Sequence, residues 1–305
     1  MNADTGAIAT TEDARLHLDR DGFRRLYDHA PFGFAHNLAQ LDLLGFASLS
    51  RLAERYDTHP QDCFVAASAP SPASEFYSVA HDRHTPRAAM DRLDAAPLRI
   101  LLKRPENHDP RFRDLLHALF RQVMDLRGGL NSERIIRLES AIFVSSAATT
   151  TPFHFDPETA FFSQIEGEKE YHVYEPAVLR EAELERFYVC DMVNIGQVRL
   201  EGRDPAREHV FALRPGDGFH QPRNAPHWVV TRNARSISYT FVFETETGRA
   251  LGRSRCCNYY IRKLGLKPER PGLHPALDSA KAGVMRTLLP ARKGLRHLLG
   301  RDHAS

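Results

Sequence analysis

Three side chains that could bind one metal ion stand at two places in this sequence. His154 and Asp156 are separated by one phenylalanine, and His227 follows far downstream, behind a Pro-Gly-Asp turn. In an extended strand, residues two apart point to the same face, so His154 and Asp156 can bind one ion together. Two histidines and one carboxylate on a β-scaffold form the facial triad of non-haem Fe(II) oxygenases, which leaves positions open on the metal.

A lysine near this pair suggests how a second ligand could be held. Lys169 lies in a long stretch without other lysines, which occur only at positions 103, 263, 267, 281 and 293. Its ammonium group would suit the distal carboxylate of the co-substrate 2-oxoglutarate. A lysine after a hairpin turn usually points to solvent. Here, however, strand alternation places Lys169 on the same face as Tyr171 and Val173, which favours the inside of a barrel.

The segment from Pro215 to Trp228 predicts the second half of the site. It contains a tight turn, a short strand, a proline corner and then His227. The spacing of Gly216, Pro222 and His227 fits the second cupin motif, in which Asn224 replaces the usual glycine and also tolerates a positive φ. Two compatible half-motifs in the right order favour a metal site over histidines that are merely buried.

Other histidines carry weaker signals. A second His-x-Asp triplet begins at His17, in a segment expected to be helical, with no partner lysine or following turn, so we expect no site there. We expect neither His172 nor His220 to be a metal ligand, although His220 could support a ligand or face the substrate. Trp228 is expected to pack in the core rather than to stack on a substrate.

With these motifs, the sequence resembles the JmjC-type branch of the cupin oxygenases, most closely its asparaginyl hydroxylase and bacterial cupin-like members. The resemblance covers about a third of the chain. It runs through Thr151 to Asp156, Phe161 to Lys169 and Pro215 to Trp228. It implies a double-stranded β-helix and an enzyme that uses Fe(II), 2-oxoglutarate and O2 to hydroxylate a C–H bond, with release of succinate and CO2.

The same resemblance assigns roles to individual residues. His154, Asp156 and His227 would bind Fe(II), and Lys169 would bind the distal carboxylate of 2-oxoglutarate with help from the Thr151 hydroxyl. Where the related hydroxylase has an asparagine just before the Phe161-Phe162 pair, this chain has Ala160. We expect a hydroxyl on a late strand to compensate for that difference, and the candidates are Ser238 and Thr240.

Two other functions fit a cupin barrel. One is a non-catalytic regulatory or ligand-binding protein, which has no need of a complete triad together with Lys169. The other is a cupin metalloenzyme that does not use 2-oxoglutarate; such sites usually combine a His-x-His pair with a glutamate, whereas Asp156 stands here. Release of succinate would distinguish the oxygenase from both.

Composition limits the possible partners and compartment. The chain has 305 residues, 42% of them hydrophobic, and a formal net charge of +2, which gives no reason to expect nucleic acid or a membrane surface as partner. Its four cysteines lack metal-ligand spacing, and the first twenty residues lack an apolar signal core. We therefore expect a cytoplasmic enzyme whose substrate is a small molecule, an amino acid or a peptide or protein side chain.

Around the site, the sequence predicts a mainly β fold with α additions, a cupin or jelly-roll barrel of residues 134–250. Residues 1–12 are expected to be disordered, and residues 13–133 to form a mostly helical region that supports the barrel. Its clearest helix begins at Asp109-Pro110 and ends at Gly128-Gly129, and it also holds a helix after Thr85-Pro86 and one buried strand over Leu98–Leu102.

The predicted barrel strands are short runs of β-branched and aromatic residues separated by turns. They are Ile135–Val144, Phe161–Ile165, Glu170–Tyr174, His209–Leu213, His227–Thr231 and Ser236–Phe243. A helix and loop over 177–197 would lie on the rim. Residues 251–305 are expected to be helical, with helices over 275–289 and 291–299. Their leucines at 288, 289, 295, 298 and 299 favour packing on the barrel or against a second copy, and we expect a homodimer.

Overall fold

The computed structural model describes residues 10–128, 134–189 and 195–298, and the side chains of residues 291–298 are excluded from that description. The described chain divides into two compact units. The first comprises residues up to 132 together with 137–178 and 197–243, and the second comprises 133–136, 179–196 and the chain from 244 onward. Residues 1–9 of the segment expected to be disordered lie outside the described residues, and Thr11–Asp13 form a short 3-10 helix, η1.

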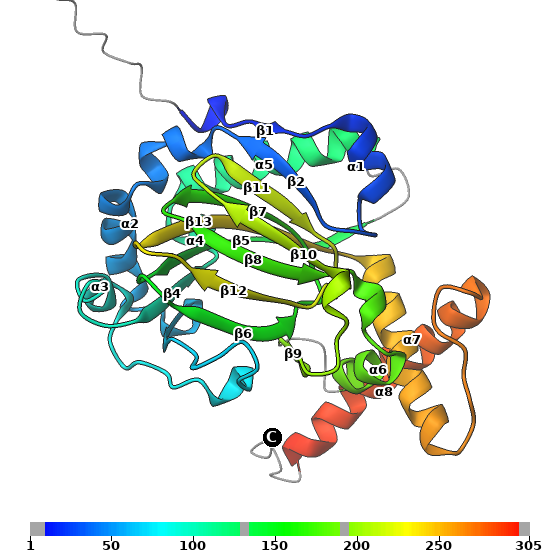
Figure 1. Cartoon of the computed structure of the whole chain (residues 1–305). Helices are drawn as coiled ribbons and strands as arrows, with labels where there is room; N and C mark the ends of the chain where they lie inside the picture. Colours follow the sequence, from blue (N-terminus) through cyan, green and yellow to red (C-terminus); the bar gives the residue numbers. More distant parts are fainter. Residues whose placement is uncertain (1–9, 129–133, 190–194, 299–305) are drawn as a thin grey trace, which may run out of the picture. The chain divides into compact units, whose positions relative to one another are not determined.

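Two antiparallel sheets make up most of the first unit (Figure 1). The larger sheet has the strand order β1-β2-β11-β7-β13-β5-β4-β3, and the smaller has the order β10-β8-β12-β6-β9. The larger sheet consists of β1 Leu16–His17, β2 Phe32–His36, β11 Asp217–Gln221, β7 Thr159–Glu166, β13 Ser236–Thr245, β5 Ile135–Ser145, β4 Leu98–Lys103 and β3 Cys63–Ala67. The smaller consists of β10 Glu208–Leu213, β8 Lys169–Tyr174, β12 His227–Thr231, β6 Thr150–Phe155 and β9 Gly196–Gln197.

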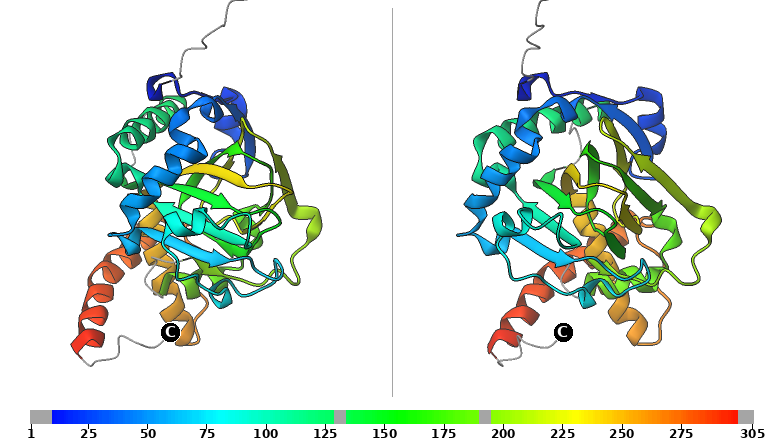
Figure 2. Two further views of the ribbon diagram at one scale, coloured as in Figure 1. Left: turned by 90° about the vertical axis from the view of Figure 1, so that its left-hand side faces the viewer. Right: turned by 60° about the vertical axis from the view of Figure 1, so that its left-hand side comes forward.

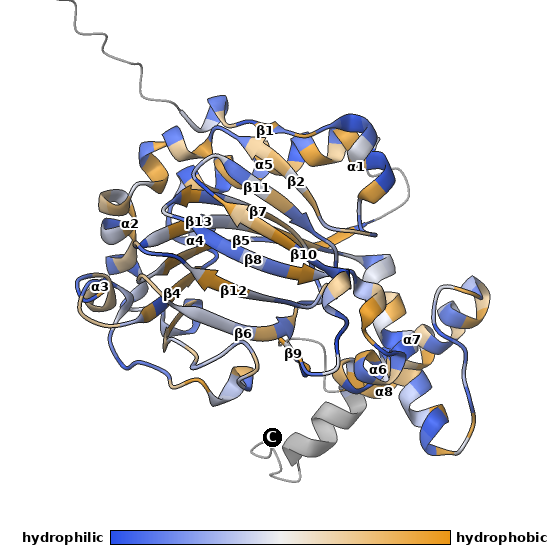
Figure 3. Ribbon diagram, in the orientation of Figure 1, coloured by the Kyte–Doolittle hydropathy of each residue, from blue (hydrophilic) through white to orange (hydrophobic). Residues whose placement is uncertain are grey.

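The chain passes from sheet to sheet in the manner of a double-stranded β-helix. From β5 to β8, successive strands alternate between the larger and the smaller sheet, and β11 to β13 alternate in the same way. The central strands are rich in apolar residues, and β7 is mostly orange in Figure 3. Between the sheets, aromatic and aliphatic side chains pack into one cluster that includes Phe162, Tyr171 and Phe219. The expected barrel is confirmed.

Helices of the N-terminal region lie on one side of these strands (Figure 2). They are α1 Arg20–Leu26, α2 Phe46–Ala53, α3 Pro86–Met90, α4 Pro105–His108 and α5 Pro110–Arg127. The predicted ends of α5 are confirmed: the Asp109 side chain accepts a hydrogen bond from Arg111 N, and Gly128 has φ +88°. Thr85 caps α3, and the strand expected over Leu98–Leu102 is β4.

The expectation of a mostly helical N-terminal region is wrong for three short strands, β1, β2 and β3. The segment around His17, expected to be helical, forms β1. β2 pairs with β11, almost two hundred residues later in the sequence, and β3 pairs with β4 across a long connection. Such short runs become strands because a distant sheet edge offers hydrogen-bond partners, which no local periodicity reveals.

The second unit is mainly helical. It contains α6 Glu181–Val189, α7 Glu246–Lys263 and α8 Pro275–Leu298. The helix expected over 177–197 is α6, while residues 190–194 lie outside the described residues. The expected break between two C-terminal helices is wrong, because α8 continues through Pro290. Within the described residues, no helix is both long and apolar enough to span a membrane.

Candidate metal centre

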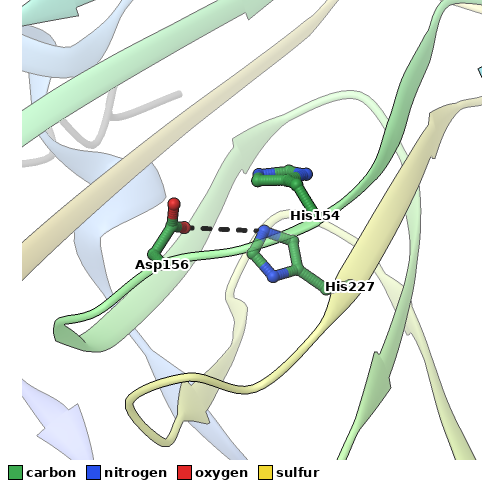
Figure 4. A group of neighbouring side chains, drawn as sticks. All are labelled: His154, Asp156 and His227. Carbon is green, nitrogen blue, oxygen red and sulfur yellow. Dashed lines mark ion pairs between the residues drawn. The ribbon is translucent and has the colours of Figure 1, made fainter. Parts of the chain in front are cut away.

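The triad predicted from the sequence is brought together at one end of the smaller sheet (Figure 4). His154 lies on β6, Asp156 follows the end of that strand, and His227 begins β12, where it pairs directly with His154. One ligand atom from each of the three lies within 4.8 Å of the other two. The Nε2 atom of His227 is 3.7 Å from Oδ2 of Asp156. This spacing fits three ligands around one ion.

Backbone carbonyls fix which nitrogen of each imidazole faces the shared position. Nδ1 of His154 is 2.7 Å from the Pro152 carbonyl oxygen, and Nδ1 of His227 is 3.0 Å from that of Ala225. Because a carbonyl oxygen only accepts, each Nδ1–H donates and each Nε2 keeps its lone pair. Burial lowers the pKa of both histidines, which keeps the rings neutral, as metal binding requires.

Two polar residues that were not predicted from the sequence position the carboxylate of Asp156, Gln221 directly and Tyr171 through Gln221. Burial raises the pKa of Asp156, and the electrostatic interaction with the His227 ring and a hydrogen bond from the Gln221 side chain oppose that shift. Gln221 in turn accepts a hydrogen bond from the Tyr171 hydroxyl at 3.1 Å. Tyr171 also stacks on His227, with ring centroids 5.2 Å apart. Tyr171 therefore supports two triad members at once.

The proline corner before His227 is tied to the same carboxylate residue. Asn224 has φ +60°, as expected for the residue that replaces a glycine. Its backbone N–H donates to the main-chain oxygen of Asp156 at 2.7 Å. This left-handed residue therefore links the two half-motifs directly.

Lys169 points into the space between the sheets, which confirms the inward orientation that strand alternation predicted. Its side chain is 5% exposed, and Nζ donates to Ser238 Oγ at 3.0 Å. The rings of Phe143 and Phe162 lie 5.7 and 5.6 Å from Nζ. Burial and, to a smaller extent, the charge of Arg99 together lower the pKa of Lys169 to about 7. Such a cation is poised to pair with an incoming anion.

The comparisons with known proteins agree with this architecture. Residues 120–251 match the model of the JmjC domain. The matched segment includes all three triad residues and Lys169. Over 122 residues, 39% of this chain, it is 31% identical to ribosomal oxygenase 2 of Bos taurus, and the match spans 22% of that relative's length.

Solved structures share the JmjC fold at lower identity. YcfD of Escherichia coli superposes with a TM-score of 0.53 at 18% identity, covering 90% of this chain and 68% of that one. A second structure, described as YcfD, a ribosomal oxygenase, in complex with cobalt and 2-oxoglutarate, has a TM-score of 0.52 at the same identity and coverage. At this identity the likeness concerns the fold.

The other residues predicted to contact the co-substrate differ in their contacts. Ser238 lies beside Lys169 and donates to Gln164 Oε1 at 2.8 Å. Thr240 donates its hydroxyl to the Phe161 carbonyl at 3.1 Å, within the larger sheet. Thr151 accepts a hydrogen bond from Arg99 at 2.9 Å. Ala160 lies on β7, opposite Gln221 of β11.

Among the described residues, no other histidine or carboxylate joins the group of His154, Asp156 and His227. His220 is a structural link: it accepts from the Asp28 backbone N–H and bonds the Ala160 carbonyl. His172 stacks on Trp228 at 3.5 Å. The expectation that Trp228 packs in the core is wrong, because it is adjacent to His227 in β12 and therefore faces outward.

Proposed function

We propose that this protein is an Fe(II)- and 2-oxoglutarate-dependent oxygenase that hydroxylates a C–H bond of a protein side chain. The observation that carries this proposal is the triad of buried His154, partly buried Asp156 and buried His227, with Lys169 facing the same barrel interior. Neither rival cupin function requires all four residues. A ligand-binding barrel needs no facial triad, and Asp156 does not fit the usual ligand set of other cupin enzymes.

The triad would bind the iron through two neutral imidazoles and one carboxylate. This set leaves positions for 2-oxoglutarate and O2 on one side of the ion. When bound, the iron couples oxidative decarboxylation of 2-oxoglutarate to succinate and CO2 with the insertion of one oxygen atom into a substrate C–H bond. Tyr171 and Gln221 keep the ligands oriented, and no protein acid or base is required for the transfer.

Lys169 would hold the distal carboxylate of 2-oxoglutarate. Apart from Ser238 and Arg99, its surroundings are aromatic, and the apolar cluster that includes Phe162 and Phe219 packs in that part of the barrel. An ion pair formed there is stronger than one in water. Ser238 sets the position of the ammonium group through its hydrogen bond.

Two aromatic residues of η6, Phe76–Ser78, lie beside the triad. The Phe76 ring lies 4.6 Å from that of His154. Tyr77 is 56% exposed, and its pKa is raised by burial of part of the ring and by the charge of Asp156. Tyr77 is thus both accessible and close to a metal ligand, and we propose that it contacts the substrate side chain.

The substrate class rests on the relatives. Ribosomal oxygenase 2 and YcfD are both described as ribosomal oxygenases. We therefore propose a ribosomal protein as substrate in place of a free small molecule, together with a cytoplasmic location.

A turnover assay tests the function. Full-length protein with Fe(II), ascorbate and 2-oxoglutarate is incubated in air with purified ribosomes and separately with isolated ribosomal proteins. We expect succinate release and a protein peptide that gains one oxygen atom, both abolished by Asp156→Ala. If 2-oxoglutarate binds but neither succinate nor an oxidised peptide forms with any ribosomal component, the ribosomal substrate is wrong. If 2-oxoglutarate does not bind at all, the enzyme class is wrong.

We also propose that the second unit mediates homodimerisation. On α8, Leu277, Val284 and Leu288 are 49%, 51% and 53% exposed. Their spacing of seven and four residues places them on one helical face. Leu289 is buried, whereas positions 295, 298 and 299 lie outside the described side chains. An exposed apolar stripe of this kind favours a protein partner, and a second copy is the simplest one.

A further inference from the structure

A second cation faces the co-substrate region from the opposite sheet. Arg99 lies on β4 of the larger sheet, where it pairs with Ser145 of β5. Its Nε donates to the Ala67 carbonyl at 3.2 Å, and its Nη1 donates to Thr151 Oγ1 at 2.9 Å. Thr151 belongs to β6 of the smaller sheet. The guanidinium group therefore reaches across the interior to the strand that carries His154.

Strand register places this contact between the metal ligands and Lys169. On one side of β12, His227 pairs with His154 and, after a shift of register, Val229 pairs with Thr151; on the other side, Thr231 pairs with Lys169. These three positions point to the same face, because they are two residues apart in one strand. Thr151, the partner of Val229, therefore lies between His154 and Lys169 along this face, and Arg99 contacts Thr151.

Neither cation has an anionic partner in the described part of the chain. No carboxylate there lies within ion-pair distance of Arg99 or Lys169, which instead contact hydroxyls, a carbonyl and aromatic rings. The two charges are also close enough to interact, since Arg99 helps to lower the pKa of Lys169. Two cations in one interior without an anion are costly. The arrangement makes physical sense if a bound ligand supplies the negative charge.

We propose that Arg99 is a specificity-determining residue of the co-substrate site. Together with Lys169 it binds the distal carboxylate, so that one cation from each sheet holds the same group. The pocket would then select dicarboxylic 2-oxo acids against 2-oxo acids with an uncharged end. This inference rests on the proposed oxygenase function, and it assigns to Arg99 a role beyond joining β3, β4 and β6.

The test compares two ligands that differ only at the distal end. Calorimetry on the full-length, Co(II)-loaded protein measures the affinity for 2-oxoglutarate and for 2-oxopentanoate, which carries a methyl group in place of the distal carboxylate. We expect Arg99→Gln to weaken 2-oxoglutarate binding about ten- to a hundred-fold, as for loss of a charge-assisted contact, and to leave 2-oxopentanoate binding nearly unchanged. Lys169→Ala should have the same selective effect.

Two further variants separate recognition from stability. Lys103→Gln removes an exposed cation from the same strand and should alter neither affinity. Arg99→Lys keeps the positive charge but lacks the several N–H donors of the planar guanidinium group. If Arg99→Gln does not fold, Arg99→Lys should still show a reduced preference for 2-oxoglutarate over 2-oxopentanoate. Equal weakening of both ligands, or no weakening of either in a folded variant, would overturn the role of Arg99. Failure of the unaltered protein to bind 2-oxoglutarate would instead overturn the proposed function.

Discussion

At the scale of single residues, the site depends on groups whose protonation is fixed by burial and by neighbouring carbonyls. His154 and His227 are neutral because their surroundings are apolar and because each donates its Nδ1 proton to the main chain. Asp156 is oriented by Gln221, which is itself held by Tyr171. The ligand atoms are therefore arranged before any metal arrives, which lowers the cost of binding.

Loss of one triad side chain should abolish tight Fe(II) binding. Loss of a residue that merely supports a metal ligand typically lowers affinity about 10- to 100-fold. Asp156→Ala and His227→Ala, which remove ligands themselves, are expected to exceed that range in an anaerobic Fe(II) titration. His172→Gln, at a histidine outside the group, is the control and should bind like the unaltered protein. Unchanged affinity in both ligand variants would refute the assignment.

Lys169 should make stability depend on pH in a defined direction. Its pKa is about 7 in the folded protein and 10.5 when unperturbed. Between these values the unfolded chain binds more protons, so the free energy of unfolding should rise with pH from about 7 to about 10. Urea unfolding of the metal-free protein measures this. The Lys169→Met variant lacks this titrating group, so its free energy of unfolding should not rise with pH for this reason. If the free energies of unfolding of the two proteins change in parallel with pH, the lowered pKa of Lys169 is wrong.

At the scale of elements, tight turns set the registers that align these residues. Gly167, between β7 and β8, has φ +70°, and a Cβ there would lie 2.1 Å from the Arg235 carbonyl oxygen. The turn passes so close to the backbone before β13 that no side chain fits. Since β8 begins two residues later with Lys169, the turn also fixes which face that lysine takes.

Two Gly→Ala substitutions separate the effect of a backbone clash from the effect of a left-handed conformation. Gly202 has φ +81° but nothing within 4 Å of its virtual Cβ. Gly202→Ala should therefore cost only the conformational strain, roughly 1 kcal/mol. Gly167→Ala adds a backbone clash and should cost about 3 kcal/mol or more, in the range of severe single mutations. Urea denaturation gives both values, and equal losses would show that the turn tolerates a Cβ.

The segment that carries η6 should govern substrate recognition without affecting the co-substrate. It is held along β6 by two backbone bonds, from Phe153 N to Pro72 O and from Ala69 N to Thr150 O. Tyr77→Ala is expected to lower kcat/KM for the protein substrate at least about ten-fold, as for loss of one good contact. The affinity for 2-oxoglutarate should stay the same. Tyr260→Ala, at a partly exposed tyrosine of α7, is the control. Unchanged kinetics for Tyr77→Ala would exclude this contact.

At the scale of the whole molecule, the two units differ in their exposed apolar surface. The first unit holds the proposed active site, with its cations facing inward. The second exposes the leucine-rich face of α8 and further apolar residues of the loop before it, Leu264, Leu266 and Leu273. The extent of this exposed surface is more typical of an interface than of isolated surface residues.

Light scattering tests the proposed homodimer. We expect the full-length chain to have twice its monomer mass. The double variant Val284→Glu, Leu288→Glu should have the monomer mass, because buried charges without partners disfavour association. Thr287→Glu, an exposed position on the same helix, should leave the mass unchanged. A monomeric full-length protein would contradict the dimer, whatever the behaviour of the variants.

The sequence alone determined the features that depend on local spacing. Alternation in a strand placed His154 with Asp156, and placed Lys169 on an inward face. Caps and glycine predicted both ends of α5, and the Pro215 to Trp228 segment predicted the return of His227 to the metal. These predictions hold because each follows from the geometry of a few consecutive residues.

Only the tertiary structure revealed the residues that act through pairing over long distances. β2 and β3 are strands because distant edges accept them, and Trp228 faces outward because its neighbour His227 must face inward. Arg99 stood in a predicted buried strand without any motif, yet it meets Thr151 across the barrel. Gln221 reaches Asp156, and Tyr171 reaches Gln221, only once β11 and β8 lie in opposite sheets. Contacts between sheets depend on strand register and on the distance between the sheets, and the spacing of neighbouring residues in the sequence predicts neither.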